Sequence, residues 1–346
     1  MKALHRSTLL AALTAAAFGT TAIPAFAQQT TPAMASAAEK EGKVVWYSSV
    51  DVKVAEGIKK AFNEQYPKIE VEVERSGSER VFQRINQEYA SNIRNVDVVN
   101  SSDASHFLFW KEKKWLAAHT PPDVAKFPPQ YRDPDNMYFA WRATLDCMAY
   151  NTNLVKEADA PKSYADLLDP KWKGKLTKAH PSYSGTALTG TYAIIKALGW
   201  EYLEKLSKQG VQQLQSTTAT PKSVASGERP VMVDGNEYNI FIEMDAKSPV
   251  KPIYAKEGTP FVTSPTAIFA AAPHPSAARV FQNFLYTAKA QQLLVDVGGQ
   301  RSVHPEVKEP ASRTPLKDIK LLADDAKTML PQINDLKKRY TTLFGN

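Results

Sequence analysis

The stretch KVVWYSS at residues 43–49 decides the fold, because it is a short apolar run that ends in small hydroxyl residues. Such a run predicts a buried strand. Val54, Ile58 and Phe62 then lie four residues apart, which predicts a helix with one buried face. Two more strands, each followed by a helix, are predicted in alternation over residues 69–116. This order favours a parallel α/β sheet with helices packed on its faces.

The three predicted strands end in serine-rich turns, Ser48-Ser49, Ser76-Gly77-Ser78 and Asn100-Ser101-Ser102-Asp103. In open α/β sheets, ligands bind beyond the carboxyl ends of the strands. Small hydroxyl side chains leave room for a ligand there and offer both donors and acceptors. A single Ser at such a place commonly caps the next helix, but three clusters at equivalent positions favour a ligand site. The candidate ligand-binding residues at this edge are Ser48, Ser49, Gly77, Ser78, Ser102 and Asp103.

A second strand–helix series begins at residues 175–179 and predicts a second α/β unit. A Pro-rich loop at residues 121–135 and a strand-like stretch at residues 139–150 separate the two series. Residues 28–38 are polar and rich in Ala and Thr, and they predict a loose leader. Further strands are predicted at residues 230–233, 250–254 and 266–271, and helices follow to residue 344.

The turn Ser182-Tyr183-Ser184-Gly185-Thr186 precedes an apolar helix of the second series. Free backbone N–H groups and the positive end of a helix dipole suit an anion at such a turn, and Gly185 allows close approach. The same motif alone is equally typical of a simple helix cap, and the three serine-rich strand ends favour the ligand site. Acids that could hold the other end of a bound anion are Asp103, Asp146 and Glu237. For Arg142 a role on a crossing strand or the surface is expected.

The composition is typical of a soluble globular protein with about two compact units. The chain has 346 residues, of which 43% are hydrophobic and 23% charged. Six His and one Cys, Cys147, exclude a zinc ribbon and a disulfide scaffold. The formal charge is +7, but Lys and Glu are interspersed, as in residues 111–114. This pattern indicates a solvated surface rather than a nucleic-acid-binding surface.

Enzymatic activity is not expected. His180, Ser182 and Ser184 are neighbours in the sequence, but adjacency is not the geometry of a catalytic triad. The sequence contains no nucleophile elbow G-x-S-x-G and no phosphate-binding G-x-x-x-x-G-K-[ST]. A secreted hydrolase therefore stays a remote alternative, and any ATP hydrolysis would belong to a partner.

The N-terminus reads as an export signal. Lys2 and Arg6 form a basic region, residues 7–18 are uncharged and apolar, and Ala25-Phe26-Ala27 is a small-x-small cleavage site. The apolar run is shorter than the roughly 20 residues that a membrane-spanning helix needs. We expect cleavage after Ala27 and a mature protein in the periplasm.

Several local patterns together resemble family 1 extracellular solute-binding proteins. The first is the opening strand at residues 43–49. The others are Ala149–Thr152 with Tyr164–Gly174, Phe281–Leu285 with Ala290-Gln291, and Gly298–Pro305. The chain is most similar to the ferric-iron and phosphosugar or phosphonate binders of ABC importers.

The resemblance implies the two-lobed α/β fold of type II periplasmic binding proteins. Two crossing strands, near Ala143–Cys147 and Phe261–Pro265, would join the lobes, and the ligand would lie in the cleft between them. The first lobe would comprise residues 28–145 and 264–346, and the second residues 146–263. Such a protein closes around its ligand by a hinge motion. We expect a monomer without a cofactor that delivers a small phosphate-, phosphonate- or carboxylate-bearing solute to a membrane permease.

Ferric iron is the alternative ligand that the resemblance leaves open. Iron binders of the family use two adjacent Tyr at the start of a second-lobe helix. The matching stretch here, Gly235–Asn239, has Tyr238 but places Asn239 where the second Tyr would be. Tyr183 could supply another phenolate, and Tyr47 and His180 are more remote possibilities. The incomplete pair favours the anion, with Tyr183 and Tyr238 as ligands if iron binds.

Overall fold

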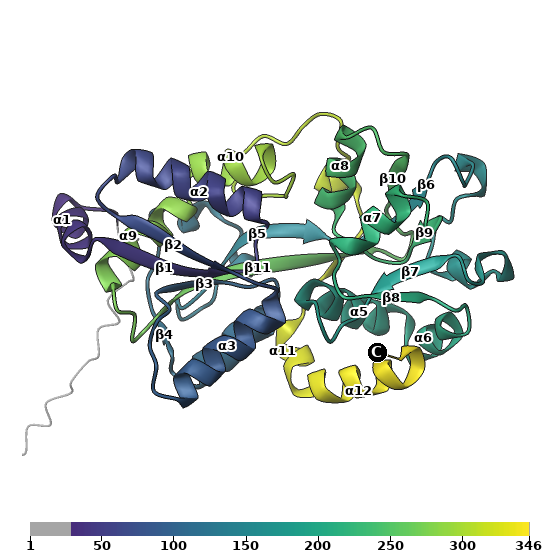
Figure 1. Ribbon diagram of the computed structural model, residues 1–346, viewed down its shortest axis with the longest axis horizontal. Helices are drawn as coiled ribbons and strands as arrows, with labels where there is room; N and C mark the ends of the chain where they lie inside the picture. Colours follow the sequence, from purple (N-terminus) through teal and green to yellow (C-terminus); the bar gives the residue numbers. More distant parts are fainter. Residues whose placement is uncertain (1–28, 346) are drawn as a thin grey trace, which may run out of the picture.

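The structure is a computed structural model that describes residues 29–345. The expected signal peptide at residues 1–27 lies outside these residues. Within them the chain forms two sheets, one toward each end of an elongated molecule (Figure 1). In the described part of the chain, no helix combines the length and the apolar character needed to cross a membrane.

The first sheet has a parallel centre, as the alternation of strands and helices predicts. Strand β1 pairs in parallel with β2 on one side and with β3 on the other. Strand β11 is antiparallel to β3 and extends beyond it toward the second sheet. The strands of this sheet are β1 (Lys43–Ser48), β2 (Glu70–Arg75), β3 (Val98–Asn100), β4 (Leu116–Ala117), β5 (Phe139–Leu145), β11 (Thr259–Phe269) and β12 (Leu321–Ala323).

Helices cover both faces of the first sheet. Val54, Ile58 and Phe62 are buried on α2, which confirms the predicted helix face. On the same face of the sheet, Trp46 meets Trp141 and Phe281 edge to face, with ring centroids 5.6 and 5.3 Å apart. The helices are α1 (Pro32–Glu41), α2 (Val52–Gln65), α9 (Pro275–Leu285) and α10 (Ala288–Asp296) on this face, and α3 (Ser78–Ala90) and α4 (Ala104–Glu112) on the other.

The predicted loose leader at residues 28–38 is wrong, because most of it belongs to α1. Thr31 caps this helix by accepting a hydrogen bond from the Met34 N–H at 3.1 Å. Pro32 at the first helical position and Gly42 at the end, with φ at 77°, complete ordinary start and stop signals. Ala38 is fully buried against α9, so a small side chain sets the close packing.

The second sheet is mixed and has the strand order β10-β6-β9-β7-β8. Its strands are β6 (Met148–Asn151), β7 (Leu176–Ala179), β8 (Gln212–Leu214), β9 (Val231–Met232) and β10 (Val250–Ile253). Its helices are α5 (Gly185–Leu198), α6 (Trp200–Ser207), α7 (Ala219–Ala225) and α8 (Glu237–Asp245). The sheet has its own core, in which Leu176, Ile194 and Leu203 are buried. The second α/β series predicted from the sequence is therefore present.

Two strands carry the chain between the sheets at the predicted places. Strand β5 continues through Asp146 and Cys147 into β6, and the chain returns from β10 into β11. Strands β5 and β11 pair antiparallel, with Thr144 opposite Val262, and lie side by side at the centre of Figure 1. The chain therefore has the two-lobed α/β fold with two crossing strands that the resemblance implies.

The end of the chain crosses once more, which the sequence did not predict. After β12, helices α11 (Ala326–Met329) and α12 (Ile333–Phe344) lie beside α5 and α6 of the second lobe (Figure 1). Tyr340 is fully buried in the second core, and Leu336 packs against Leu188. Residues 264–346 were expected in the first lobe, whereas α12 packs on the second lobe and α11 contacts both α4 and α5. The other lobe boundaries stay predictions.

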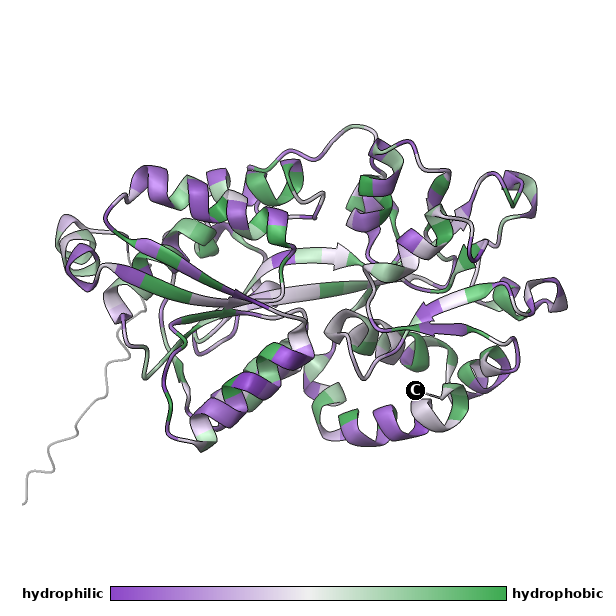
Figure 2. Ribbon diagram, in the orientation of Figure 1, coloured by the Kyte–Doolittle hydropathy of each residue, from purple (hydrophilic) through white to green (hydrophobic). Residues whose placement is uncertain are grey.

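The amphipathic pattern of α12 explains why its position could not be read from the sequence. In Figure 2, α3 and α12 both alternate between hydrophobic and hydrophilic residues along their length. Such a pattern predicts that one face is buried, but not against which lobe. The location is decided by the apolar surface that α5 and α6 offer.

Candidate functional site

The structure brings the serine-rich strand ends together at one edge of the first sheet. The Ser49 N–H donates to the Asn100 carbonyl at 3.2 Å, and the Ser76 N–H donates to the Ser48 carbonyl at 3.1 Å. The Ser49 hydroxyl is buried and has no hydrogen-bond partner among residues 29–345. Leaving a buried hydroxyl unpaired costs about 1–3 kcal/mol. This hydroxyl is therefore a candidate ligand contact, whereas Ser48 bonds to Asn100.

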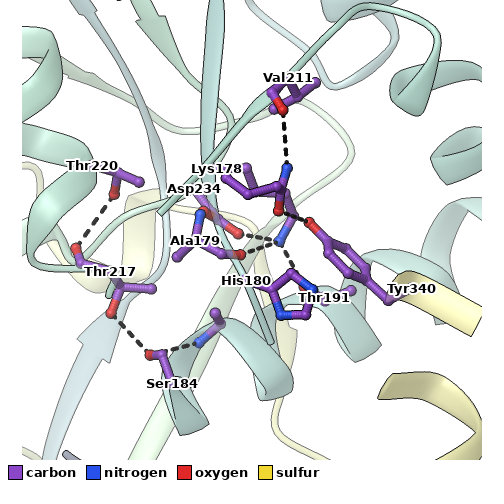
Figure 3. A network of polar contacts seen from close by, with 12 residues as sticks. Lys178, Ala179, His180, Ser184, Thr191, Val211, Thr217, Thr220, Asp234 and Tyr340 are labelled. Carbon is purple, nitrogen blue, oxygen red and sulfur yellow. Dashed lines mark hydrogen bonds and ion pairs between the residues drawn. The ribbon is translucent and has the colours of Figure 1, made fainter. Parts of the chain in front are cut away.

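The predicted second-lobe turn is the start of α5. The Ser184 hydroxyl accepts the Ala187 N–H at 3.3 Å, and it lies 3.4 Å from the Thr217 hydroxyl (Figure 3). Thr186 is buried, whereas Ser182 is half-buried and Tyr183 is exposed. Ser184 therefore caps the helix, and Tyr183 does not point into a closed site.

The two edges touch each other at Gly185. Its N–H donates to the Ser78 hydroxyl of the first lobe at 2.9 Å. A Cβ atom at this glycine would lie 2.8 Å from both the Ser78 hydroxyl oxygen and the Asp103 Cβ. Close approach of a ligand to Gly185 stays a prediction, and the group that lies against this glycine in the structure is the opposite lobe. The Gly185 N–H expected to bind an anion is used by Ser78.

Of the three acids expected to hold a ligand, Glu237 is fully paired within the protein, and Asp103 uses one of its two carboxylate oxygens as a helix cap. Glu237 accepts two hydrogen bonds at 2.8 Å from the Arg301 guanidinium and one at 2.5 Å from the Tyr254 hydroxyl. Asp103 caps α4 by accepting the Ser105 N–H at 2.8 Å. Glu237 is almost fully buried in this pairing. It therefore serves as the partner of Arg301.

The third acid, Asp146, is fully buried where β5 leads into the second lobe. A Cβ atom on Gly190 of α5 would overlap its Oδ2, so the carboxyl packs directly against that helix. Burial and, after it, the charge of Asp234 raise the pKa of Asp146 well above its usual range. Asp234 is itself paired at 2.5 Å with the buried Lys178, as Figure 3 shows. We therefore expect Asp146 to be neutral.

Arg142 is the residue that sequence reasoning undervalued. It lies on β5 with 3% of its surface exposed. Its Nε has no hydrogen-bond partner, and its guanidinium forms no ion pair among residues 29–345. Burial lowers the pKa of Arg142. Tyr238 raises this pKa, whereas the charge of Arg75 lowers it further. A buried charge without a partner carries an effective penalty of several kcal/mol, so this position calls for an anion.

Unpartnered polar groups surround Arg142 from both lobes. Ser264 lies directly across from it on β11, and the Ser264 hydroxyl is buried without a partner among the described residues. From the second lobe, the Tyr238 hydroxyl accepts a hydrogen bond from Asn236 Nδ2 at 3.2 Å, and Asn236 Oδ1 has no described partner. The Asn236 N–H in turn donates to the Thr217 carbonyl at 3.1 Å.

A line of contacts thus runs across the junction of the lobes. On the first lobe, Arg142, Ser264, Asn100 and Ser48 lie on the successive strands β5, β11, β3 and β1. On the second lobe, the line consists of Ser184, Thr217, Asn236 and Tyr238. We call these residues together with Ser49 the junction site. It offers one cation, hydroxyls and amides.

The two tyrosines expected for iron differ in their surroundings. Tyr183 is 42% exposed and contacts the His180 ring, whereas Tyr238 is buried beside Asn236. Burial raises the pKa of Tyr238, so its hydroxyl is protonated and can donate a hydrogen bond. Ferric iron binds the deprotonated phenolate, so iron binding at Tyr238 would require the loss of this proton.

A cavity of about 820 Å³ lies elsewhere, beside the crossing strands. Its walls include Tyr131, Tyr138, Phe261 and Thr263, and none of the ligand residues expected from the sequence lines it. The size of this cavity therefore does not by itself mark the ligand site. The unpaired Arg142 is the stronger indication.

Comparisons with known proteins agree with the fold. The family described as bacterial extracellular solute-binding protein matches residues 94–321. A probable ABC transporter periplasmic-binding protein of Sinorhizobium fredii is 22% identical, over 70% of this chain and 70% of that protein. An Fe(3+)-binding periplasmic protein of Serratia marcescens is 22% identical, over 78% of this chain and 80% of that protein. The periplasmic binding protein AfuA of Actinobacillus pleuropneumoniae, solved with fructose 6-phosphate, has a similar fold. Its TM-score is 0.80 at 23% identity, over 88% of this chain and 98% of that one.

Proposed function

The chain belongs to the bacterial extracellular solute-binding protein family, and we propose that it captures a small organic anion whose charged end binds to Arg142. It would do so as the periplasmic binding component of an ABC importer. The single observation that carries this proposal is the buried guanidinium without an ionic partner among the described residues. In proteins, buried charges are paired, and a ligand anion would supply the missing partner.

The chemistry of the junction site fits a phosphate, phosphonate or carboxylate. A guanidinium offers parallel N–H donors that match two oxygens of such a group. The unpartnered hydroxyls of Ser49 and Ser264 add donors without bulk. Tyr238 and Ser184 would contact the ligand from the second lobe. The predicted residues Ser182, Tyr183 and Glu237 are not part of this proposal. Ser182 is half-buried, Tyr183 is exposed and Glu237 is paired with Arg301.

Binding would be coupled to closure of the lobes. Arg142 and Ser264 lie on crossing strands, and Tyr238 lies at the start of α8 on the second lobe. A ligand held by both groups favours the closed arrangement, in which Gly185 touches Ser78. We expect the exported monomer to present this closed form to a permease in the membrane.

Ferric iron is the alternative, and the relative from Serratia marcescens is named for iron binding. The sugar phosphate in the AfuA structure is a precedent for the organic anion. Arg142 favours the organic anion over ferric iron, because a buried cation attracts an anion and repels a bare metal ion. Iron would bind here only together with an anion that neutralises Arg142.

Native mass spectrometry of the protein exported by its own host tests the proposal. We expect the spectrum to show one organic ligand of small mass bound to the purified protein. Analogues of that ligand that phosphatases cannot cleave should displace it. Thermal denaturation with fructose 6-phosphate, and with fructose as the uncharged control, would then show whether the negative charge is required. A mass increment of one iron atom with a tyrosinate colour, lost in Tyr238→Phe, would contradict the proposal.

A further inference from the structure

Three metal-ligating side chains meet inside the first lobe, next to the junction of the lobes. They are Glu79 from the first turn of α3 and Asp103 and His106 from the start of α4. The exposed fractions of the three residues are 7%, 0% and 4%. One potential ligand atom from each lies within 4.8 Å of the others. The proposed function does not use these three side chains to bind the anion.

The ring nitrogen of His106 faces both carboxylates. Nε2 lies 3.3 Å from Glu79 Oε1 and 3.5 Å from Asp103 Oδ2. Neither of these oxygens has a hydrogen-bond partner of normal geometry among residues 29–345. Two unpartnered and deeply buried carboxylate oxygens therefore point toward the same nitrogen.

Two of the three spacings match those of a tetrahedral metal site. Bonds of about 2.0–2.1 Å from Zn²⁺ to nitrogen and oxygen place neighbouring ligands about 3.3–3.4 Å apart in a tetrahedron. The two distances from His106 Nε2 are close to that value. One His and two carboxylates leave a fourth position for water.

A hydrogen bond behind His106 completes the arrangement. Its Nδ1 lies 2.8 Å from the Ser101 hydroxyl. When this hydroxyl accepts the Nδ1 proton, Nε2 is left unprotonated and directed at the two carboxylates. Histidines that bind metals are commonly oriented by such a second hydrogen bond. In this tautomer Nε2 faces two acceptor oxygens, and a cation between them would satisfy all three atoms.

The charge around the cluster also calls for a cation. Lys337 of α12 binds Glu79 Oε2 at 2.8 Å and is the one cation paired with these acids in the described residues, other than His106. With a neutral imidazole, the acids outnumber Lys337.

We propose that Glu79, Asp103 and His106 bind a divalent first-row transition-metal ion, for which Zn²⁺ is the natural probe. The second lobe covers this site, because Gly185 contacts Asp103 and Lys337 pairs with Glu79. The ion enters when the lobes separate and is enclosed when they meet. Bound metal then stabilises the first-lobe surface on which the second lobe closes.

The test uses the exported protein, purified without a histidine tag and treated with a chelator. Calorimetric titration with Zn²⁺ should show one ion per chain. X-ray absorption of the wild-type Zn²⁺ complex should show one imidazole nitrogen and oxygen ligands near 2.0–2.1 Å without sulfur. This spectrum needs no variant, so the proposal stays testable if a substitution disturbs folding.

Variants identify the ligands. His106→Gln and Glu79→Gln should each weaken Zn²⁺ binding by more than about 100-fold, since loss of a second-shell partner alone costs 10–100-fold. His274→Gln is the matched control, because His274 pairs with the single carboxylate of Asp97 at 2.8 Å and belongs to no group of three possible metal ligands among residues 29–345. It should bind Zn²⁺ as the wild type does. Absence of stoichiometric binding, sulfur or no imidazole in the spectrum, or unchanged affinity in His106→Gln would overturn the proposal.

Discussion

Gly185→Ala is the substitution that most sharply separates closure of the lobes from stability of the fold. The added methyl group would lie 2.8 Å from the Asp103 Cβ and 2.8 Å from the Ser78 hydroxyl oxygen. Carbon atoms in contact are normally about 3.5–4.0 Å apart. The Ser78 hydroxyl can rotate away, but the Asp103 Cβ is fixed to its backbone. The lobes must therefore separate at this point by roughly 1 Å.

The cost falls on the closed form alone. Overpacking of this kind typically costs about 1–3 kcal/mol, which corresponds to about 5- to 150-fold weaker ligand binding. Gly185 is the first residue of α5, and Ala is a better helix former than Gly. We therefore expect the melting temperature of the ligand-free protein to be unchanged or slightly raised.

Calorimetry with the ligand found by mass spectrometry measures the affinity, and small-angle scattering measures the separation of the lobes. Gly57→Ala on α2 is the matched control, since its nearest neighbour would be the Val297 Cγ1 at 3.9 Å. It should leave affinity and scattering unchanged. If Gly185→Ala binds as tightly as the wild type and closes fully, the reasoning about the contact between the lobes is wrong.

Three further predictions concern the scaffold. Glu237→Gln leaves the buried Arg301 with Glu309 as its remaining ionic partner and should lower the free energy of unfolding by about 1–3 kcal/mol in urea titrations. Because the pKa of Asp146 is raised in the fold, its carboxyl keeps a proton that the unfolded chain loses above about pH 4. The free energy of unfolding of the wild type should therefore fall relative to that of Asp146→Asn as the pH rises above about 4. Parallel pH profiles of the two proteins would contradict this assignment. Tyr340→Ala should lower the free energy of unfolding by about 3–5 kcal/mol. Because Tyr340 belongs to the second core, hydrogen exchange should become faster in α5 and α6 before it does in α9. A uniform loss of protection would argue against that placement.

The local parts of the fold could be predicted because they are written in short-range patterns. The run at residues 43–49 and the spacing of Val54, Ile58 and Phe62 identify β1 and α2 without any distant information. The serine-rich ends meet because parallel strands end at the same edge of a sheet. The cap at Ser184 follows from its place before an apolar run.

The rest depends on contacts between distant residues. Glu237 and Arg301 are 64 positions apart and carry no pattern that links them. The spacing of apolar residues in α12 does not indicate that this helix packs on the second lobe. Arg142 looks like any strand residue until its burial and its lack of a partner are known.

The metal-ligating cluster shows the same limit. His106 follows Asp103 by three residues, which a helix places on one face, but Glu79 comes from a different helix. Six His and one Cys excluded a zinc ribbon, and the metal considered from the sequence was ferric iron at Tyr183 and Tyr238. Only the packing of α3 beside α4 brings the third ligand into reach.

The most direct test of the central claim is a calorimetric titration of Arg142 variants with the co-purified organic anion. Arg142→Gln should weaken binding by about 100-fold or more, because two charge-assisted hydrogen bonds of about 1.5–3 kcal/mol each are lost. Arg142→Lys keeps the charge without the paired donors and should lose less. The ligand-free Arg142→Gln protein should melt no lower than the wild type, since a buried unpaired charge is removed. Arg84→Gln, which changes an exposed and paired arginine, is the control. Wild-type affinity in a folded Arg142→Gln protein would contradict the account.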